Sequence, residues 1–356
     1  MKRVDNVRKQ FQSLGIDAFI VESEANRRYL SHFTGSAGVV FLTESESYFI
    51  TDFRYVEQAT SQCVGYTIVE HKGSVATEIQ ELVKKHNVKA VGFEKSYTTF
   101  EKYELYKHEY SIPLVPLSGV VESLRQFKDE EEIVTMKKAA AIADEAYTHI
   151  LNYIKPGMRE KEVRDELEFK MRQLGADGSS FDMIVASGAR GALPHGVASD
   201  KVIEEGELVT LDFGAIYEGY CSDITRTLAV GEPSEQMKKV FDTVLQAQLK
   251  GVEQIKPGMT GQEADDICRS YIYEQGYEGK FGHGLGHGLG IEVHEEPRLS
   301  PKGNVVLQPG MVVTVEPGVY LPGIGGVRIE DDIVITETGN ERLTTSDKTL
   351  KYAGQN

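Results

Sequence analysis

Four carboxylates lie at the ends of strand-like apolar segments in the second half of the chain. Asp212 follows the run LVTL, Glu316 follows MVVTV, and Asp223 and Glu330 lie at two further strand-like segments. A carboxylate at the end of a buried strand is costly unless it is paired or metal-bound. A bond to a nearby Lys, Arg or backbone N–H would explain any one of them. Four such groups at one site would repel each other, so the set predicts bound divalent cations.

A segment rich in glycine and histidine lies close to these acids in the sequence. It reads FGHGLGHGLG over residues 281–290, and glycine allows close backbone approach while His283 and His287 can point into one pocket. The glycine spacing matches neither dinucleotide-binding nor phosphate-binding loops, and no lysine closes the segment. One imidazole and four carboxylates suit Mn²⁺, and also Co²⁺ or Zn²⁺. Two such cations can activate a water and polarise a carbonyl, which is chemistry for hydrolysing an amide.

Two further histidines lie near this set. His294 is part of EVHEEP, so the HExxH zinc-helix motif is absent, and His195 lies in a predicted loop ahead of Asp212. A lone loop histidine is more often a surface residue than a catalytic one, so its importance depends on its neighbours.

An internal duplication places the acids at equivalent points. The pentapeptide IKPGM occurs at residues 154–158 and again at 255–259, and a helical pattern with acidic residues in its first turns follows each copy. The segment GELVTLD at 206–212 matches GMVVTVE at 310–316, and Asp223 matches Glu330 in the same order. Two similar halves predict a pseudo-twofold α+β domain, because a solenoid requires at least three repeats.

The first part of the chain has a different pattern. Apolar strand-like runs, at residues 18–21, 39–42, 48–50, 66–69 and 90–93, alternate with helical segments, one of them at 74–86. This alternation predicts an α/β layer domain. A long helix is predicted from Asp129 to about Tyr153. We therefore expect an N-terminal domain over residues 1–124 and a second domain over 125–356.

Composition narrows the classes of partner and location. The chain has 356 residues and a formal net charge of −16, which argues against binding nucleic acid or anionic lipid. No apolar stretch is long enough to span a membrane, and the N-terminus has no signal-peptide pattern, so a cytoplasmic location is expected. The 3 cysteines show no CxxC spacing, which argues against a disulfide framework or a cysteine zinc site.

The spacing of Asp212, Asp223, His287, Glu316 and Glu330 resembles the metal set of the pita-bread metallopeptidases, which include methionine aminopeptidase, aminopeptidase P and prolidase. The segments NRRYL to FTGSAG, at residues 26–38, and TDFRY, at 51–55, resemble the creatinase-type N-terminal domain. Methionine aminopeptidases lack that domain. The resemblance thus implies the proline-specific branch, with a creatinase-like α/β domain ahead of a pita-bread α+β catalytic domain.

The resemblance also implies how the metals are bound. Two divalent ions per subunit are expected, with manganese favoured over cobalt or zinc. Asp212 would chelate one ion, His287 and Glu316 would bind the other, and Asp223 and Glu330 would bridge both.

Catalytic roles follow from the same resemblance. Glu316 would also accept the proton of the attacking water. His195, His283 and His294 occupy the positions of the family's substrate-facing histidines. Arg328 resembles the arginine that orients the site and, in prolidases, grips the terminal carboxylate of the substrate.

These observations lead to one favoured function and several alternatives. We expect a homodimeric Xaa-Pro dipeptidase (prolidase) acting on small Xaa-Pro peptides, and the alternative is an aminopeptidase P that cleaves longer peptides. A metal-free creatinase-like hydrolase and an inactive binding module on the same fold are more remote. Such proteins lose metal ligands, whereas all five positions are present here.

Overall fold

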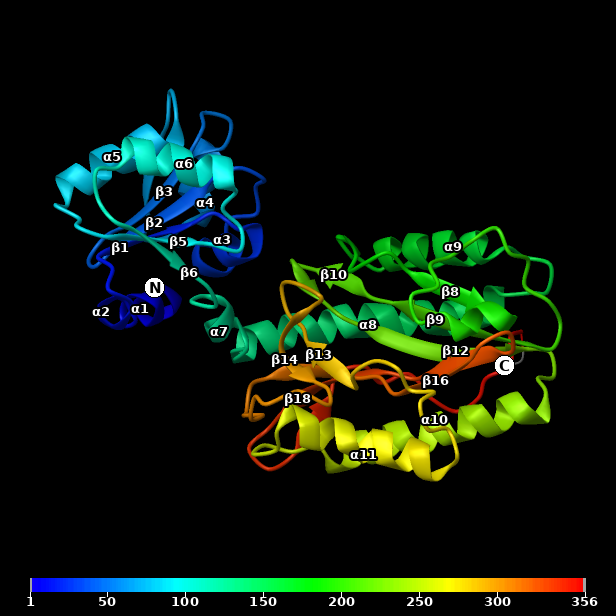
Figure 1. Ribbon diagram of the computed structural model, residues 1–356. Helices are drawn as coiled ribbons and strands as arrows, with labels where there is room; N and C mark the ends of the chain where they lie inside the picture. The colour runs from blue at the N-terminus through cyan, green and yellow to red at the C-terminus, as the bar shows by residue number, and fades with distance from the viewer. Residues whose placement is uncertain (1, 355–356) are drawn as a thin grey trace. The chain divides into compact units, whose positions relative to one another are not determined.

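The computed structural model describes residues 2–354 (Figure 1). The chain divides into two compact units, Met1–Arg125 and Gln126–Asn356.

The first unit is an α/β layer structure built on one mixed sheet. The sheet has six strands in the order β4-β3-β2-β1-β5-β6, in which β1 pairs antiparallel with β2 and parallel with β5. The strands are β1 (Ala18–Val21), β2 (Val39–Thr43), β3 (Ser47–Thr51), β4 (Thr67–Glu70), β5 (Val91–Glu94) and β6 (Leu114–Leu117). The helices are α1 (Lys2–Arg8), α2 (Phe11–Leu14), α3 (Glu24–Ser31), α4 (Val56–Gln62), α5 (Val75–Lys85), α6 (Phe100–Glu109) and α7 (Glu122–Arg125).

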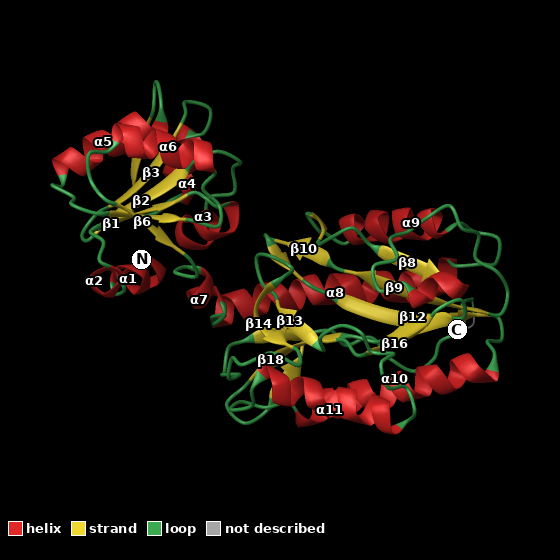
Figure 2. Cartoon of the chain, in the orientation of Figure 1, coloured by secondary structure: helices red, strands yellow, loops and turns green. Residues whose placement is uncertain are grey.

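The second unit places its strands between helices (Figure 2). Its helices are α8 (Glu130–Tyr153), α9 (Glu160–Gln173), α10 (Glu235–Gln254) and α11 (Gly261–Glu274), with a 3-10 turn η1 (Gly188–Ala192). Its strands in the first half are β7 (Gly178–Ser179), β8 (Ile184–Ser187), β9 (Glu207–Phe213), β10 (Ala215–Tyr217), β11 (Tyr220–Cys221) and β12 (Ile224–Val230). Those in the second half are β13 (Gly286–Gly288), β14 (Glu295–Leu299), β15 (Val312–Val315), β16 (Gly318–Leu321), β17 (Gly325–Arg328), β18 (Asp331–Ile335) and β19 (Asn340–Arg342).

The predicted duplication is visible in the backbone. Gly157 and Gly258, the glycines of the two IKPGM copies, have φ of +92° and +90°, a conformation that favours glycine. Each donates its N–H to a residue that precedes a ligand-bearing strand, Gly157 to Ile203 at 2.8 Å and Gly258 to Leu307 at 2.9 Å. The repeated turn therefore docks a helix, α9 or α11, against the segment that leads into β9 or β15.

Each half has its own apolar core. One cluster joins α8 and α9 to β8, β9 and β12, and the other joins α10 and α11 to β15, β17 and β18. The predicted long helix is α8, whose side chain at the N-cap, Asp129, accepts from the Glu132 N–H in a capping box. Among the described residues, no helix is long and apolar enough to cross a membrane.

Candidate metal centre

The four predicted acids lie at the ends of two antiparallel strand pairs. In the pair of β9 and β12, Asp212 lies opposite Thr225, and Asp223 immediately precedes β12. In the pair of β15 and β18, Val315 lies opposite Asp331, so Glu316 and Glu330 flank the last paired position. The Glu330 N–H donates to the Thr225 carbonyl at 3.1 Å, which joins the two pairs at the centre of the unit.

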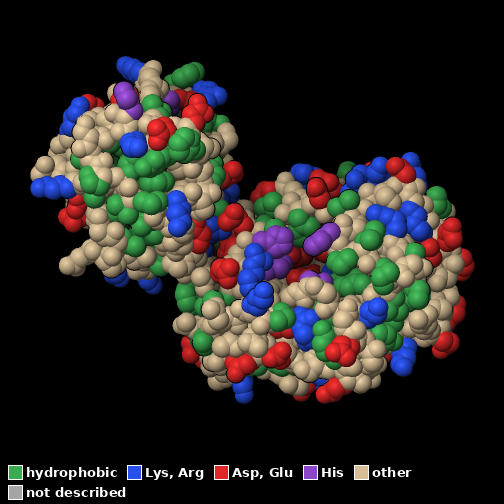
Figure 3. Space-filling model, viewed as in Figure 1, with side chains coloured by type: hydrophobic (Ala, Val, Ile, Leu, Met, Phe, Trp, Pro, Cys, Tyr) green, Lys and Arg blue, Asp and Glu red, His purple; other side chains and the backbone are tan. Residues whose placement is uncertain are grey.

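All nine residues singled out in the sequence line one cavity of about 470 Å³, a volume suited to a small ligand. They are the predicted metal ligands and the predicted catalytic residues: Asp212, Asp223, His287, Glu316, Glu330, His195, His283, His294 and Arg328. Histidine and acidic side chains gather around a hollow in the face of the second unit that Figure 3 shows. The structure thus brings together groups that are up to 135 residues apart, from His195 to Glu330.

The donor set fits divalent cations. Ligand atoms of Asp223, His287 and Glu330 all lie within 4.8 Å of one another. His287 Nε2 is 3.7 Å from Asp223 Oδ2 and 3.5 Å from Glu316 Oε1. Asp223 Oδ1 is buried without any hydrogen-bond partner. A buried, unpaired carboxylate oxygen that faces other ligand atoms is what a cation site presents when its ligands are preformed.

His287 presents an unprotonated ring nitrogen, Nε2, to the other predicted metal ligands. His287 Nδ1 lies 3.1 Å from the Gly288 carbonyl, which can only accept, so Nδ1 carries the proton in the neutral ring. Burial lowers the pKa of His287 to about 3, so the ring is neutral at physiological pH. The lone pair of Nε2 therefore faces the carboxylates, as in metal-ligating histidines whose other nitrogen donates to a carbonyl.

Burial and the mutual repulsion of its carboxylates favour protonation of part of this acidic cluster when no metal is bound. Burial is the main cause that raises the pKa of Glu316 to about 8, and burial with the neighbouring Glu330 and Asp212 raises the pKa of Asp223 well above its usual range. Between the ordinary glutamate pKa and about 8, the native metal-free protein holds a proton that the unfolded chain has released. The contribution of these carboxyl groups to stability therefore falls as pH rises through this window, and above the ordinary histidine pKa the buried His287 no longer opposes it.

This linkage gives a testable result. We expect the melting temperature of EDTA-treated protein to fall between pH 6 and pH 8, and the increase on adding Mn²⁺ to be larger at pH 8, because the cation replaces the protons. Differential scanning fluorimetry of both forms at several pH values would measure it. An equal Mn²⁺-induced increase at pH 6 and pH 8 would contradict the predicted protonation.

Arg328 is held on one side of the cavity by several acceptors. Its Nη2 pairs with Asp212 Oδ2, its Nη1 donates to the Tyr320 hydroxyl at 2.9 Å, and its side chain is 4% exposed. The Tyr320 hydroxyl in turn donates to His283 Nε2 at 2.7 Å, while His283 Nδ1 donates to the Gly284 carbonyl at 2.8 Å. Both ring nitrogens of His283 therefore have protein partners, and Arg328 orients Asp212 and Tyr320.

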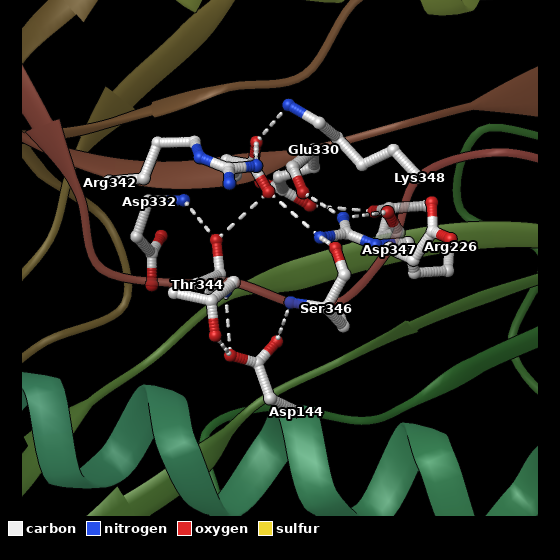
Figure 4. Close-up of polar contacts among 12 residues, drawn as sticks. Asp144, Arg226, Glu330, Asp332, Arg342, Thr344, Ser346, Asp347 and Lys348 are labelled. Atoms are coloured by element: carbon white, nitrogen blue, oxygen red, sulfur yellow. Dashed lines mark hydrogen bonds and ion pairs between the residues drawn. The ribbon is translucent and has the colours of Figure 1, made fainter.

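A buried network holds the backbone of Glu330 and Asp223, and Figure 4 shows the part of it around Arg226, Glu330 and Asp332. Arg226 pairs with Asp331 at 2.8 Å and donates to the Glu330 carbonyl. Asp332 Oδ2 accepts from the Asp223 N–H at 2.8 Å. Thr225 Oγ1 donates to Glu330 Oε2 at 2.6 Å and fixes that carboxylate directly. Groups that do not bind metal therefore set the orientation of two of the predicted ligands.

Several contributors were not predicted from the sequence. They are Tyr320, Thr225, Thr314, which donates to Glu316 Oε1 at 3.2 Å, and Arg298, which lines the cavity. Thr225 and Thr314 each lie two residues from a predicted ligand, on strands where alternate side chains share a face. That spacing was the available signal for both. Tyr320 and Arg298 carried no comparable signal.

Comparison with known proteins places the chain in a family. The model of the metallopeptidase family M24 matches residues 134–337, and that of the creatinase/prolidase N-terminal domain matches residues 3–127. An Xaa-Pro dipeptidase of Pyrococcus horikoshii is 42% identical over 94% of both chains. The solved structure of an Xaa-Pro dipeptidase from Bacillus anthracis has a TM-score of 0.98 and 54% identity, covering 99% of each chain. That of an X-Pro aminopeptidase from Thermotoga maritima has a TM-score of 0.92 and 39% identity, covering 97% of this chain and 99% of the other.

These likenesses extend over both units and confirm the predicted fold, a creatinase-type N-terminal domain ahead of a pita-bread catalytic domain. The chain therefore belongs to the metallopeptidase family M24 and is a metal-dependent peptidase.

Proposed function

We propose that the protein is an Xaa-Pro dipeptidase in which Asp212, Asp223, His287, Glu316 and Glu330 hold two divalent ions. One observation carries the choice of a dipeptidase. The cavity that contains these ligands also contains an accessible guanidinium, Arg298, that can bind a free carboxylate close to the site of cleavage. Relatives of both the dipeptidase and the aminopeptidase type support a proline-specific peptidase.

Different residues of the cavity would carry out different steps of peptide-bond hydrolysis. When bound, the two ions would polarise the scissile carbonyl and lower the pKa of a water. Glu316 would take the proton of that water and pass it to the departing proline nitrogen. His195 and His294, both exposed in the cavity, would donate to the oxygen on which negative charge develops. Arg328 keeps Asp212 in place.

Two arginines line the cavity, and they differ in accessibility. Arg328 is committed to Asp212 and Tyr320. The side chain of Arg298 is 49% exposed, and its ion pair with the half-exposed Glu296 spans 3.9 Å. A weakly paired guanidinium can form a bidentate contact with a carboxylate. In a dipeptide that carboxylate directly follows proline, whereas in a longer peptide an amide takes its place.

Substitution at Arg298 tests the proposal. We expect Arg298→Ala to lower kcat/KM for an Xaa-Pro dipeptide by about ten- to a hundredfold, the value of hydrogen bonds to a charged group. Hydrolysis of an Xaa-Pro-Xaa tripeptide should change little. The assay uses enzyme stripped with EDTA and reloaded with Mn²⁺, and exposed Lys302→Ala is the matched control. A wild-type enzyme that cleaves the tripeptide faster than the dipeptide would instead support aminopeptidase P.

Manganese is our proposal for the metal, because four of the five ligands are carboxylates. Activity after reloading with Mn²⁺, Co²⁺ or Zn²⁺ would compare the three ions. The homodimer and the cytoplasmic location stay predictions, and sedimentation velocity would test the first.

A further inference from the structure

The helices that follow the two IKPGM turns each carry one carboxylate with no exposure to solvent. These are Glu160, the first residue of α9, and Asp265, within α11. Neither lines the cavity or belongs to the metal ligands. A fully buried carboxylate is costly unless hydrogen bonds and a cation satisfy it, so its partners identify what it holds in place.

Glu160 binds both ends of the loop that carries His195. Its Oε1 accepts from the N–H and hydroxyl of Ser187 at 2.8 and 2.9 Å, and its Oε2 accepts from the N–H and hydroxyl of Ser199 at 3.1 and 2.6 Å. The guanidinium of Arg190 also pairs with Oε2, and it donates to the Val197 carbonyl at 2.8 Å. The Glu160 carboxylate therefore accepts from five donors of residues 187, 190 and 199, and these contacts join the two ends of the loop.

Asp265 performs the same task for the segment that carries His283. It pairs with Arg269 through both oxygens, at 2.5 and 2.8 Å, and its Oδ1 accepts from the Leu285 N–H at 2.8 Å. Arg269 then donates to the carbonyls of Phe281 and His283 at 2.8 and 2.7 Å, and its guanidinium lies 4.2 Å from the Phe281 ring centroid. The backbone of 281–285 is thus held on both sides of His283.

We propose that Glu160 and Asp265 are positioning residues, each fixing the histidine-bearing segment of its own half relative to the metal ligands. The inference rests on the proposed function insofar as His195 acts on substrate, while His283 is bonded to Gly284 and Tyr320. Around His195 the backbone bonds of the loop are short-range: Leu193 donates to Arg190, Gly196 to Leu193 and Val197 to His195. Two longer-range bonds add to them, from the Ala198 N–H to the Met183 carbonyl at 3.4 Å and from Arg328 to the Pro194 carbonyl at 3.3 Å. Those local turns shape the loop, and the contacts with Glu160 attach it to α9.

The first test measures the attachment directly, without activity. Glu160→Gln replaces one acceptor oxygen by an NH₂ group, which cannot accept the hydrogen bonds that Ser187, Arg190 and Ser199 donate. We expect hydrogen exchange of the amides in 188–199 to accelerate at least about tenfold, while the rest of the second unit and the bound Mn²⁺ stay unchanged. Asp265→Asn should do the same for 281–285. Unchanged exchange in these segments would overturn the proposal.

The second test asks whether the effect passes through the histidine. Misplacing a reacting group by a fraction of its contact distance lowers the rate strongly, so Glu160→Gln should lower kcat/KM by about ten- to a hundredfold. In a His195→Ala background, the same substitution should change kcat/KM less than about twofold, because the group it positions is gone. An equal loss in both backgrounds would mean a general structural role and would overturn the positioning role.

Controls separate the possible failures. Glu168→Gln on α9 and Asp266→Asn, the exposed neighbour of Asp265, remove the same charges and should leave exchange and activity unchanged. If Glu160→Gln does not fold, Arg190→Lys replaces it, because a lysine keeps the charge but cannot bond both Glu160 and the Val197 carbonyl. Arg269→Lys replaces Asp265→Asn for the same reason. If His195→Ala alone is neutral, the proposed function of His195 fails, and the exchange data alone decide on the attachment.

Discussion

Replacing Glu316 by Gln should lower kcat/KM for an Xaa-Pro substrate by about a thousandfold while most of the metal stays bound. General base catalysis contributes about 10²- to 10⁴-fold, and an amide at this position cannot accept a proton. The carbonyl oxygen of Gln can still act as a ligand. Thr314 can still donate to it, as it now donates to Glu316 Oε1 at 3.2 Å. Loss of activity with retained metal would separate the role of base from the role of ligand.

The measurement combines steady-state kinetics with metal analysis of the purified variant. Glu337→Gln, an exposed glutamate in the turn after β18, is the matched control and should behave as wild type. Retention of more than about a tenth of wild-type activity at full metal occupancy would show that another group accepts the proton.

Two of the predicted ligands, Asp212 and Glu316, follow apolar runs that are buried strands in the structure. Residues 208–211 and 312–315 are all buried, as the continuous runs ahead of Asp212 and Glu316 predicted. The duplication predicted that Asp223 and Glu330 are equivalent, but the strand registers differ: Thr225 lies opposite Asp212, whereas Glu330 adjoins Asp331, which lies opposite Val315. Regular elements with apolar interiors are encoded locally, and so they were visible in the sequence.

Elements with polar interiors were not visible in the same way. Helix α3 buries Asn26 and Arg27, because Asn26 donates to Glu94 at 2.7 Å and Arg27 donates to the Gly35 carbonyl at 2.9 Å. A hydrophobic pattern cannot reveal a helix whose buried face is hydrogen-bonded to distant residues.

The same limit applies to the arginines of the site. Arg328 is buried because Asp212, 116 residues away in the chain, faces it, while Arg298 is exposed in the same cavity. Which arginine binds protein and which can bind substrate depends on long-range packing. The family resemblance implied that Arg328 orients the site and grips the substrate carboxylate, and we propose Arg298 for the second of these roles.

The largest effect on stability is expected from Arg226→Met. The Arg226 side chain is 1% exposed and pairs with Asp331, which is fully buried, so the substitution leaves a buried carboxylate short of one cation. Breaking a buried pair from one side costs about 3–5 kcal/mol. Lys348 still contacts Asp331 at 2.6 Å and Gln248 still donates to it at 3.0 Å, so we expect the lower end, about 3 kcal/mol.

A second arginine on the same carboxylate provides the control. Arg342 lies 3.5 Å from Asp331, but its side chain is 36% exposed, so Arg342→Met should cost less than about 1 kcal/mol. Urea unfolding of the metal-free variants measures both values without stabilisation by bound metal. Because Arg226 also holds the Glu330 carbonyl, its loss should weaken Mn²⁺ binding as well, whereas Arg342→Met should leave it unchanged. Equal losses of stability in the two variants would mean that burial does not decide the strength of this network.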